Sequence, residues 1–263
     1  MKRTAAAVCL CFVFGIGILF VWQNTAEQDK EEGRPCEVTA EWNGRIYSVV
    51  TDPKSDAFDD YMLEKNITSD LIGEKLGSQE IVMQNDENGT VTDTAALYRY
   101  AKAPITQFDW YPRIIIKDTK GNFYHAVTGS WFDADTQTPE EVFQVYGLNS
   151  SEDIKAVKQR KDYGSKRITE KNFIQKFYQG LITEEWGDSD FLQKNVYQNT
   201  GIDERDINKL YEQHADDAVY LVVELKNGMC LNVSFSSHPF AEVFHGLYFK
   251  VTEDQLALMS ELK

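Results

Sequence analysis

The side chains that could perform acid–base or metal chemistry are few and widely spaced along this chain. The four histidines are His125, His214, His238 and His245. Only His238 and His245 are close in sequence, where they flank Pro239 to Glu242 and could converge across a turn. Imidazole transfers protons and binds metals near neutral pH, but a hydrogen-bonded structural histidine is the commoner case. The pattern therefore favours structural histidines and predicts no catalytic residue.

The motifs of common enzyme and metal sites are also missing. The sequence has no Gly-x-Ser-x-Gly elbow, no His-Glu-x-x-His and no Gly-Lys-Ser/Thr phosphate loop. Asp133-Ala134-Asp135 matches the start of a calcium loop, but Thr138 and Gln144 stand where that loop requires glycine and an acidic residue. A loop capped by polar side chains is the better interpretation. We predict no metal and no cofactor.

Aromatic residues are the strongest candidates for recognition. Trp110, Tyr111 and Trp131 lie close to Phe108 and Phe132 in sequence. Exposed aromatic rings often anchor contacts to peptides or glycans. Side chains in strands point alternately to opposite faces, so some of these rings must face the core. Recognition and simple packing therefore both remain open for Trp110, Tyr111 and Trp131.

An uncharged apolar run covers residues 5–22, directly after the basic residues Lys2 and Arg3. As a helix it would span roughly 27 Å, close to the hydrocarbon thickness of a bilayer. Its length and bulky end favour a retained signal anchor that contacts the lipid bilayer, with residues 1–4 in the cytoplasm and the rest of the chain outside. The alternative is a signal peptide that is cleaved, giving a secreted protein.

The cysteines give one further expectation. Cys9 and Cys11 lie within the apolar run, which leaves Cys36 and Cys230 for the extracytoplasmic part. An even pair outside the cytoplasm permits a disulfide, provided that the two Cα atoms lie within about 7 Å of each other. The alternative is two unrelated thiols.

Composition and charge describe an acidic, globular chain. Residues 23–35 form a polar tract that we interpret as a flexible stalk, and the rest is long enough for one large or two small domains. The formal net charge is −15, with 27 basic and 42 acidic residues. A nucleic-acid-binding protein neutralises phosphates with clustered Lys and Arg, so nucleic acid is excluded as a partner.

Residues 36–148 are predicted to form a mostly β lobe. Asn43-Gly44 separates two alternating runs at 37–42 and 45–51, which is typical of a hairpin with a type I′ turn. A short strand is expected at 80–84, and a second hairpin is expected from 110–117 and 123–127. Thr138, Pro139 and Gly147 have the residue types of an N-cap, a first helical position and a helix end.

Residues 149–263 are predicted to form an α+β lobe. A polar, edge-like strand is expected around 153–160, followed by a helix capped by Thr169 and a second helix at 203–214. The clearest hairpin pairs 219–225 with 229–235, and a further strand and a terminal helix follow. The order of these elements suggests an antiparallel sheet with helices on one side.

Four short segments resemble uncharacterised membrane-anchored or secreted envelope proteins of Gram-positive bacteria. They are Leu71–Gly77, Ile168–Lys171, Leu225–Gly228 and Gly246–Val251. The resemblance implies an envelope location and the same fold class, and it assigns no activity and no catalytic residue.

These observations predict an α+β protein in which an N-terminal membrane helix is followed by two small lobes of antiparallel sheet with packed helices. The predicted function is that of a membrane-anchored extracytoplasmic binding or interaction module, not an enzyme, with an unknown protein or cell-envelope ligand as its partner. The alternative is an extracytoplasmic hydrolase whose site is assembled from residues distant in sequence, around His238, His245 and nearby carboxylates.

Overall fold

The computed structural model describes seven stretches of the chain, and all structural statements below concern them. They are residues 37–85, 89–160, 166–182, 185–197, 218–235, 240–243 and 246–260.

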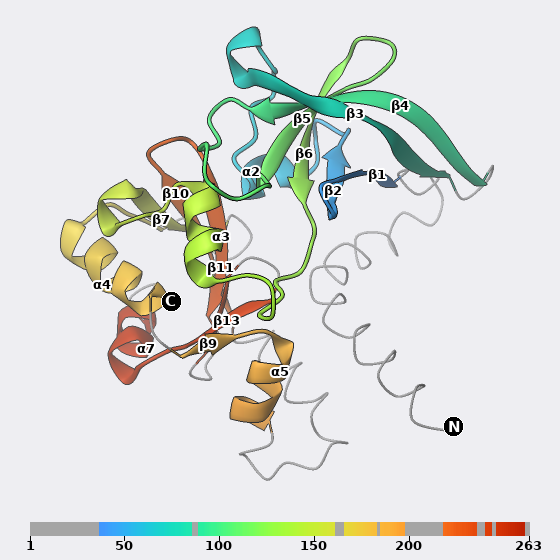
Figure 1. Ribbon diagram of the computed structural model, residues 1–263. Helices are drawn as coiled ribbons and strands as arrows, with labels where there is room; N and C mark the ends of the chain where they lie inside the picture. The colour runs from blue at the N-terminus through green and yellow to red at the C-terminus, as the bar shows by residue number, and fades with distance from the viewer. Residues whose placement is uncertain are drawn as a thin grey trace, which may run out of the picture.

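Six antiparallel strands close into a barrel in the order β1-β2-β6-β5-β4-β3 (Figure 1). The strands are β1 (Glu37–Trp42), β2 (Arg45–Val50), β3 (Ile72–Asn85), β4 (Gly89–Tyr100), β5 (Arg113–Lys117) and β6 (Phe123–Thr128). The β1–β2 turn holds Asn43 at φ 51° and Gly44 at φ 73°. Two residues with positive φ between paired strands are what a type I′ turn needs, so the predicted hairpin is confirmed.

The interior of the barrel is filled by its own side chains. Every second residue along the strands points inward, and the inward-facing residues all have exposed fractions of 9% or less. They are Val38, Ala40, Tyr47, Val49, Ile81, Ala95, Leu97, Ile114, Ile116 and Ala126. A barrel of this size has room only for such packing. The described interior is therefore a core.

A second, seven-stranded antiparallel sheet has the order β8-β7-β10-β11-β12-β13-β9. Its strands are β7 (Ile154–Gln159), β8 (Arg167–Ile168), β9 (Trp186–Gly187), β10 (Val219–Leu225), β11 (Cys230–Phe235), β12 (Phe240–Val243) and β13 (Leu247–Lys250). The β10–β11 hairpin pairs Val219 with Phe235 and Glu224 with Cys230, as the sequence predicts. Both edge strands have only two residues, which limits the unpaired backbone that a sheet edge presents.

Short helices cover the second sheet and connect it to the barrel. They are α2 (Ala57–Asp60), η1 (Ser69–Leu71), α3 (Pro139–Tyr146), η2 (Ser151–Asp153), α4 (Lys171–Leu181), α5 (Ser189–Leu192), η4 (Gln193–Tyr197) and α7 (Glu253–Ser260). Helix α3 begins as predicted, because the Thr138 hydroxyl accepts a hydrogen bond from the Glu141 amide at 3.2 Å. Helices α4 and α7 lie side by side on the second sheet (Figure 1).

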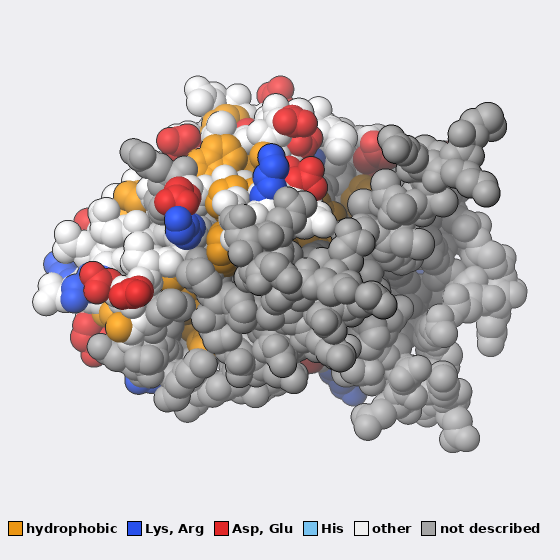
Figure 2. All heavy atoms as spheres, turned by 90° about the horizontal axis from the view of Figure 1, so that it is seen from below, with side chains coloured by type: hydrophobic (Ala, Val, Ile, Leu, Met, Phe, Trp, Pro, Cys, Tyr) orange, Lys and Arg blue, Asp and Glu red, His pale blue; other side chains and the backbone are white. Residues whose placement is uncertain are grey.

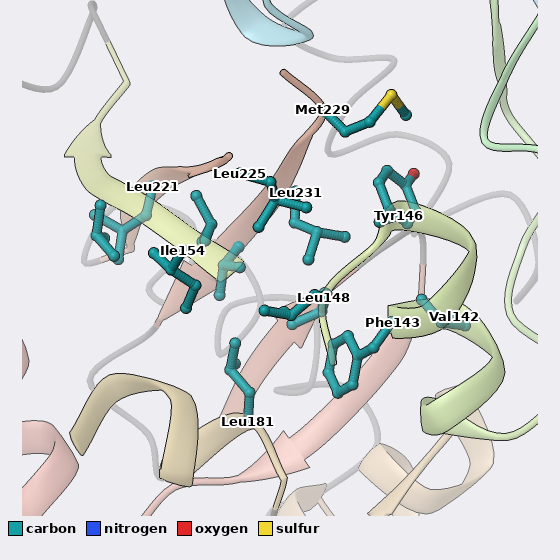
Figure 3. Close-up of a cluster of buried hydrophobic side chains, with 14 of the residues drawn as sticks. Val142, Phe143, Tyr146, Leu148, Ile154, Leu181, Leu221, Leu225, Met229 and Leu231 are labelled. Atoms are coloured by element: carbon teal, nitrogen blue, oxygen red, sulfur yellow. The ribbon is translucent and has the colours of Figure 1, made fainter. Parts of the chain in front are cut away.

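One continuous hydrophobic core joins the two sheets. Figure 3 shows Val142, Phe143 and Tyr146 of α3 facing strand residues such as Leu221 and Leu231. The Phe143 ring stacks on Phe249 of β13 with 5.8 Å between centroids. The same core includes Tyr100 and Ile115, which lie on the outer face of the barrel. Barrel and sheet are therefore packed against each other.

The predicted fold class is wrong. The described chain is mostly β and contains a closed barrel and a second sheet, not two small lobes of antiparallel sheet with packed helices. The prediction failed chiefly at β3 and β4. The pairing of these strands shifts register between Ile72 and Lys75 and again between Lys75 and Gly77. Such bulges interrupt the alternation from which strands are recognised, so the sequence predicts only a turn and a short strand where β3 closes the barrel.

Two smaller expectations also need correction. Strand β7 lies between β8 and β10, so it is not an edge strand. Helix α4 has Glu170 as its N-cap, one residue after Thr169.

Several other expectations fall outside the described residues. They concern the apolar run at 5–22, the stalk at 23–35 and the helix at 203–214. Among the helices that the structure describes, none combines the length and apolar character needed to cross a membrane.

Candidate functional site

A partly buried group of polar side chains lies where the barrel meets the segment that follows α2. We call Glu64, Tyr100, Lys102, Arg113 and His125 the polar cluster. The Glu64 carboxylate accepts hydrogen bonds of 2.6 Å from both the Tyr100 hydroxyl and the Lys102 amine. Arg113 Nη1 lies 3.5 Å from the second carboxylate oxygen of Glu64. His125 Nε2 lies 3.0 Å from the Glu64 carbonyl oxygen. The strands β4, β5 and β6 thus all hold Glu64.

The same segment is also attached to the second sheet. Arg160 donates two hydrogen bonds to Asp60, with Nε–Oδ1 at 2.7 Å and Nη2–Oδ2 at 2.6 Å. The buried Cys230 thiol lies 3.5 Å from the Asp60 carbonyl oxygen. Arg113 also donates to the carbonyl of Tyr61. Residues 60–64 therefore bridge the two sheets through charged and polar contacts.

The electrostatics of the polar cluster argue against proton-transfer chemistry. Burial raises the pKa of Glu64, but hydrogen bonds from Lys102 and Tyr100 outweigh burial and leave the pKa below its ordinary value. Burial, reinforced by the nearby Arg113 charge, lowers the pKa of His125 to about 4. A general acid or base works best with a pKa near the working pH. Both groups are shifted away from neutrality, so a structural role fits the polar cluster.

The sequence contained one overlooked signal for the polar cluster. Arg113 and His125 interrupt the apolar strands β5 and β6, and their side chains are only 3% and 1% exposed. Charged side chains are almost never fully buried without a partner. Two polar interruptions on paired strands predict a partner, but the position of Glu64 follows only from the fold.

A second candidate site lies at one end of the barrel, where the β1–β2 hairpin is bonded to the loops at residues 107–111 and 129–137. We call the exposed side chains Ile46 and Trp131 the loop-end surface; Trp42, which stacks with Tyr111, points to the opposite face of the β1–β2 hairpin from Ile46. The Ile46 amide donates to the Ser130 hydroxyl at 3.0 Å, and the Gly129 amide donates to the Ile46 carbonyl at 2.9 Å. These bonds fix the loop that carries Trp131 to strand β2.

The loop at residues 107–111 is also fixed to the β1–β2 hairpin by hydrogen bonds. The buried Tyr47 hydroxyl donates to the Tyr111 carbonyl at 2.8 Å, and the Asn43 side chain donates to the Asp109 carbonyl. The Tyr111 ring stacks on Trp42 with 5.7 Å between centroids and 10° between planes. Segments distant in sequence are thus brought together on a rigid barrel.

The three aromatics proposed from the sequence have different environments. Trp110 is only 3% exposed, lies under the Arg45 guanidinium, which is 3.9 Å from its ring centroid, and donates to Glu141. The packing alternative therefore describes Trp110. Tyr111 is partly buried in its stack with Trp42. Trp131 is 44% exposed and Ile46 is 55% exposed, so these two side chains offer apolar surface to solvent.

Glu242 lies next to the loop-end surface, at the turn between β12 and β13. Its carboxylate accepts a 3.0 Å hydrogen bond from the Gly246 amide. The Trp131 ring packs over Gly246, where an added Cβ would lie 2.7 Å from Trp131 Cε3. Burial raises the pKa of Glu242 to about 7. Among the described carboxylates, Glu242 is the one whose shifted pKa falls near neutrality.

The remaining predictions have the following outcomes. Cys230 is buried, and Cys36 lies outside the described residues, so their disulfide stays a prediction. His214, His238 and His245 also lie outside them. Asp133 accepts hydrogen bonds from the Asp135 amide at 3.0 Å and the Thr136 hydroxyl at 2.9 Å, as in a loop capped by polar side chains. In the described part of the chain, no three His, Cys, Asp or Glu side chains are grouped to hold a metal ion.

No family model, no curated protein and no solved structure matches this chain.

Proposed function

We propose that this chain is an extracytoplasmic binding module that holds a protein or cell-envelope ligand at the loop-end surface and catalyses no reaction. One observation carries the proposal. Three loops from distant parts of the sequence are fixed to the barrel by hydrogen bonds, and they present Ile46 and Trp131 to solvent. Rigid aromatic and aliphatic side chains of this kind anchor binding interfaces, because little conformational entropy is lost when they are covered.

The location is supported by the sequence alone. The apolar run at 5–22, directly after Lys2 and Arg3, is an export segment that acts as an anchor or as a cleaved signal. The net charge of −15 disfavours nucleic acid and anionic lipid headgroups as partners of the exported part.

The binding role is tested by site-specific photo-cross-linking in the producing cell. A photoreactive amino acid is placed at Trp131 and, in a control protein, at Lys120. Lys120 is exposed in the turn between β5 and β6, at the opposite end of that hairpin from the Trp131 loop. We expect a discrete adduct with an envelope component from position 131 and none from position 120. Equal labelling from the two positions contradicts the proposal.

Glu242 supports the alternative of a hydrolase. A carboxyl group with a pKa of about 7 suits a general acid or base, and His238 and His245 flank it in sequence. The competing explanation is structural, because the Glu242 carboxylate already caps the β12–β13 turn through the Gly246 amide.

Glu242→Gln separates these two explanations, because glutamine retains the acceptor for the Gly246 amide but cannot transfer a proton. The wild-type protein and the variant are compared on chromogenic ester, peptide and glycoside substrates. Hydrolysis by the wild type that falls at least about 100-fold in Glu242→Gln, with unchanged thermal stability, establishes the hydrolase. Equal rates in both proteins mean that Glu242 has the structural role and not a catalytic one.

A further inference from the structure

We infer that the loop-end surface binds a cationic segment of another polypeptide, one that places an apolar side chain against Ile46 and Trp131 and lysine or arginine side chains around them. This inference rests on the proposed function and specifies its partner. It depends on the charges that surround the apolar residues.

Four carboxylates surround the loop-end surface. Glu41 lies directly opposite Ile46 in the β1–β2 pairing, so both side chains point to the same face of the hairpin. Asp109 lies in the loop whose carbonyl is bonded to Asn43. Asp133 and Asp135 follow Trp131 in its loop. All four residues are exposed.

Little positive charge offsets these carboxylates. Arg45 is the one basic residue in the segments 41–46, 107–111 and 129–137. Its side chain is mostly buried, stacked on Trp110 with Glu141 3.9 Å away. No salt bridge joins Glu41, Asp109, Asp133 or Asp135 to a described lysine or arginine. The rim of the surface is therefore negative.

In the space-filling view, Asp and Glu side chains lie among hydrophobic ones, together with Lys and Arg side chains, on the described part of the face in view (Figure 2). An acidic rim around apolar residues attracts cations during encounter and rejects anions. A purely charged polycation would leave the exposed apolar surface of Ile46 and Trp131 in water. A polypeptide segment can supply the basic and the apolar side chains together.

The test is a selection from a library of random 12-residue peptides on the full chain in detergent micelles. Three variants are compared with the wild type. The first is Ile46→Ser. The second, the rim variant, combines Glu41→Gln, Asp133→Asn and Asp135→Asn, and retains the side-chain acceptors of the Asp133 loop. The third is a matched control that combines Glu80→Gln, Glu152→Gln and Asp254→Asn, all exposed acidic residues outside the three loops. It changes the net charge by the same amount.

We expect the selected peptides to be richer in lysine and arginine than the unselected library and to contain an apolar residue. Their affinity should fall about tenfold or more in the rim variant and in Ile46→Ser, and change less than about twofold in the matched control. Circular dichroism of each variant checks that it is folded.

The outcomes separate this inference from the proposed function. Peptides without a basic excess that still lose binding in Ile46→Ser overturn the inference and leave the proposed function standing. Equal losses in the rim variant and the matched control also overturn the inference, because net charge would then explain the binding. If Ile46→Ser binds every selected peptide as the wild type does, both are overturned.

Discussion

The polar cluster and the loop-end surface lie on the same barrel but differ in which kind of side chain is exposed to water. In the polar cluster, Arg113 and His125 are removed from water and lie around Glu64, whose carboxylate also accepts hydrogen bonds from Tyr100 and Lys102. At the loop-end surface, apolar side chains remain in water and the charges around them are unpaired with described cations. Buried charges with shifted pKa values are often taken as signs of catalysis, but here they join barrel and sheet, and the exposed apolar residues are the better guide to function.

Glu64→Ala provides the strongest test of this comparison. The substitution leaves Arg113, whose side chain is 3% exposed, without its carboxylate partner and releases the segment at residues 60–64. Breaking a buried ion pair in this way costs about 3 kcal/mol of unfolding free energy, at the low end of the usual range because Glu64 is itself partly exposed. Urea denaturation followed by circular dichroism measures the loss. A change below about 1 kcal/mol, comparable with that of Glu80→Gln, contradicts the role assigned to the polar cluster.

The pH dependence of stability tests His125 in the same cluster. Because its pKa is about 4 in the folded state and about 6.5 in the unfolded state, only the unfolded chain binds a proton at His125 between these values. Stability is therefore retained above pH 6.5 and is lost as the pH falls from about 6.5 towards 4. The expected loss is roughly 3 kcal/mol. Urea midpoints measured across this range should slope less steeply in His125→Gln, and equal slopes contradict the assignment.

Gly246→Ala tests the support of the loop-end surface, because Gly246 lies under the Trp131 ring and donates its amide hydrogen to Glu242. At φ 97° a side chain is strained, and the new Cβ would displace the Trp131 ring. We expect a loss of about 1 to 2 kcal/mol of stability and a shift in tryptophan fluorescence. Gly44→Ala is a suitable control, because it adds similar backbone strain at φ 73° but has no side chain within 4 Å. An identical fluorescence change in both variants contradicts the contact.

The sequence predicted local structure better than architecture, and the reason is visible at particular residues. Asn43-Gly44 and the sequence from Thr138 to Gly147 determine their own backbone through turn and cap geometry, and both predictions are confirmed. The closure of the barrel depends instead on β1 pairing with β3 across about forty residues, as Ala40 does with Ile81. No local pattern encodes that pairing, and the bulges in β3 concealed the strand.

The candidate sites show the same limit. Trp131 could be selected from its residue type, but the attachment of its loop to Ile46 follows from hydrogen bonds between segments that are distant in sequence. Trp110 has the same residue type and lies in the core, because Arg45 and Glu141 close over it. Residue type therefore identifies candidates for recognition, and only the fold determines which of them reach solvent.

Ile46→Ser should have the smallest effect on stability and the most selective effect on binding. Ile46 is 55% exposed, so its replacement removes little buried apolar area, and the backbone bonds to Ser130 and Gly129 do not require its side chain. The expected change in unfolding free energy is below about 0.5 kcal/mol, as is usual for surface substitutions. Cross-linking from position 131 should nevertheless fall severalfold, while Glu64→Ala, measured where it remains folded, should retain it. Loss of cross-linking in both variants would mean that the two regions are not independent, and loss in neither would mean that Ile46 exposes apolar surface without a binding role.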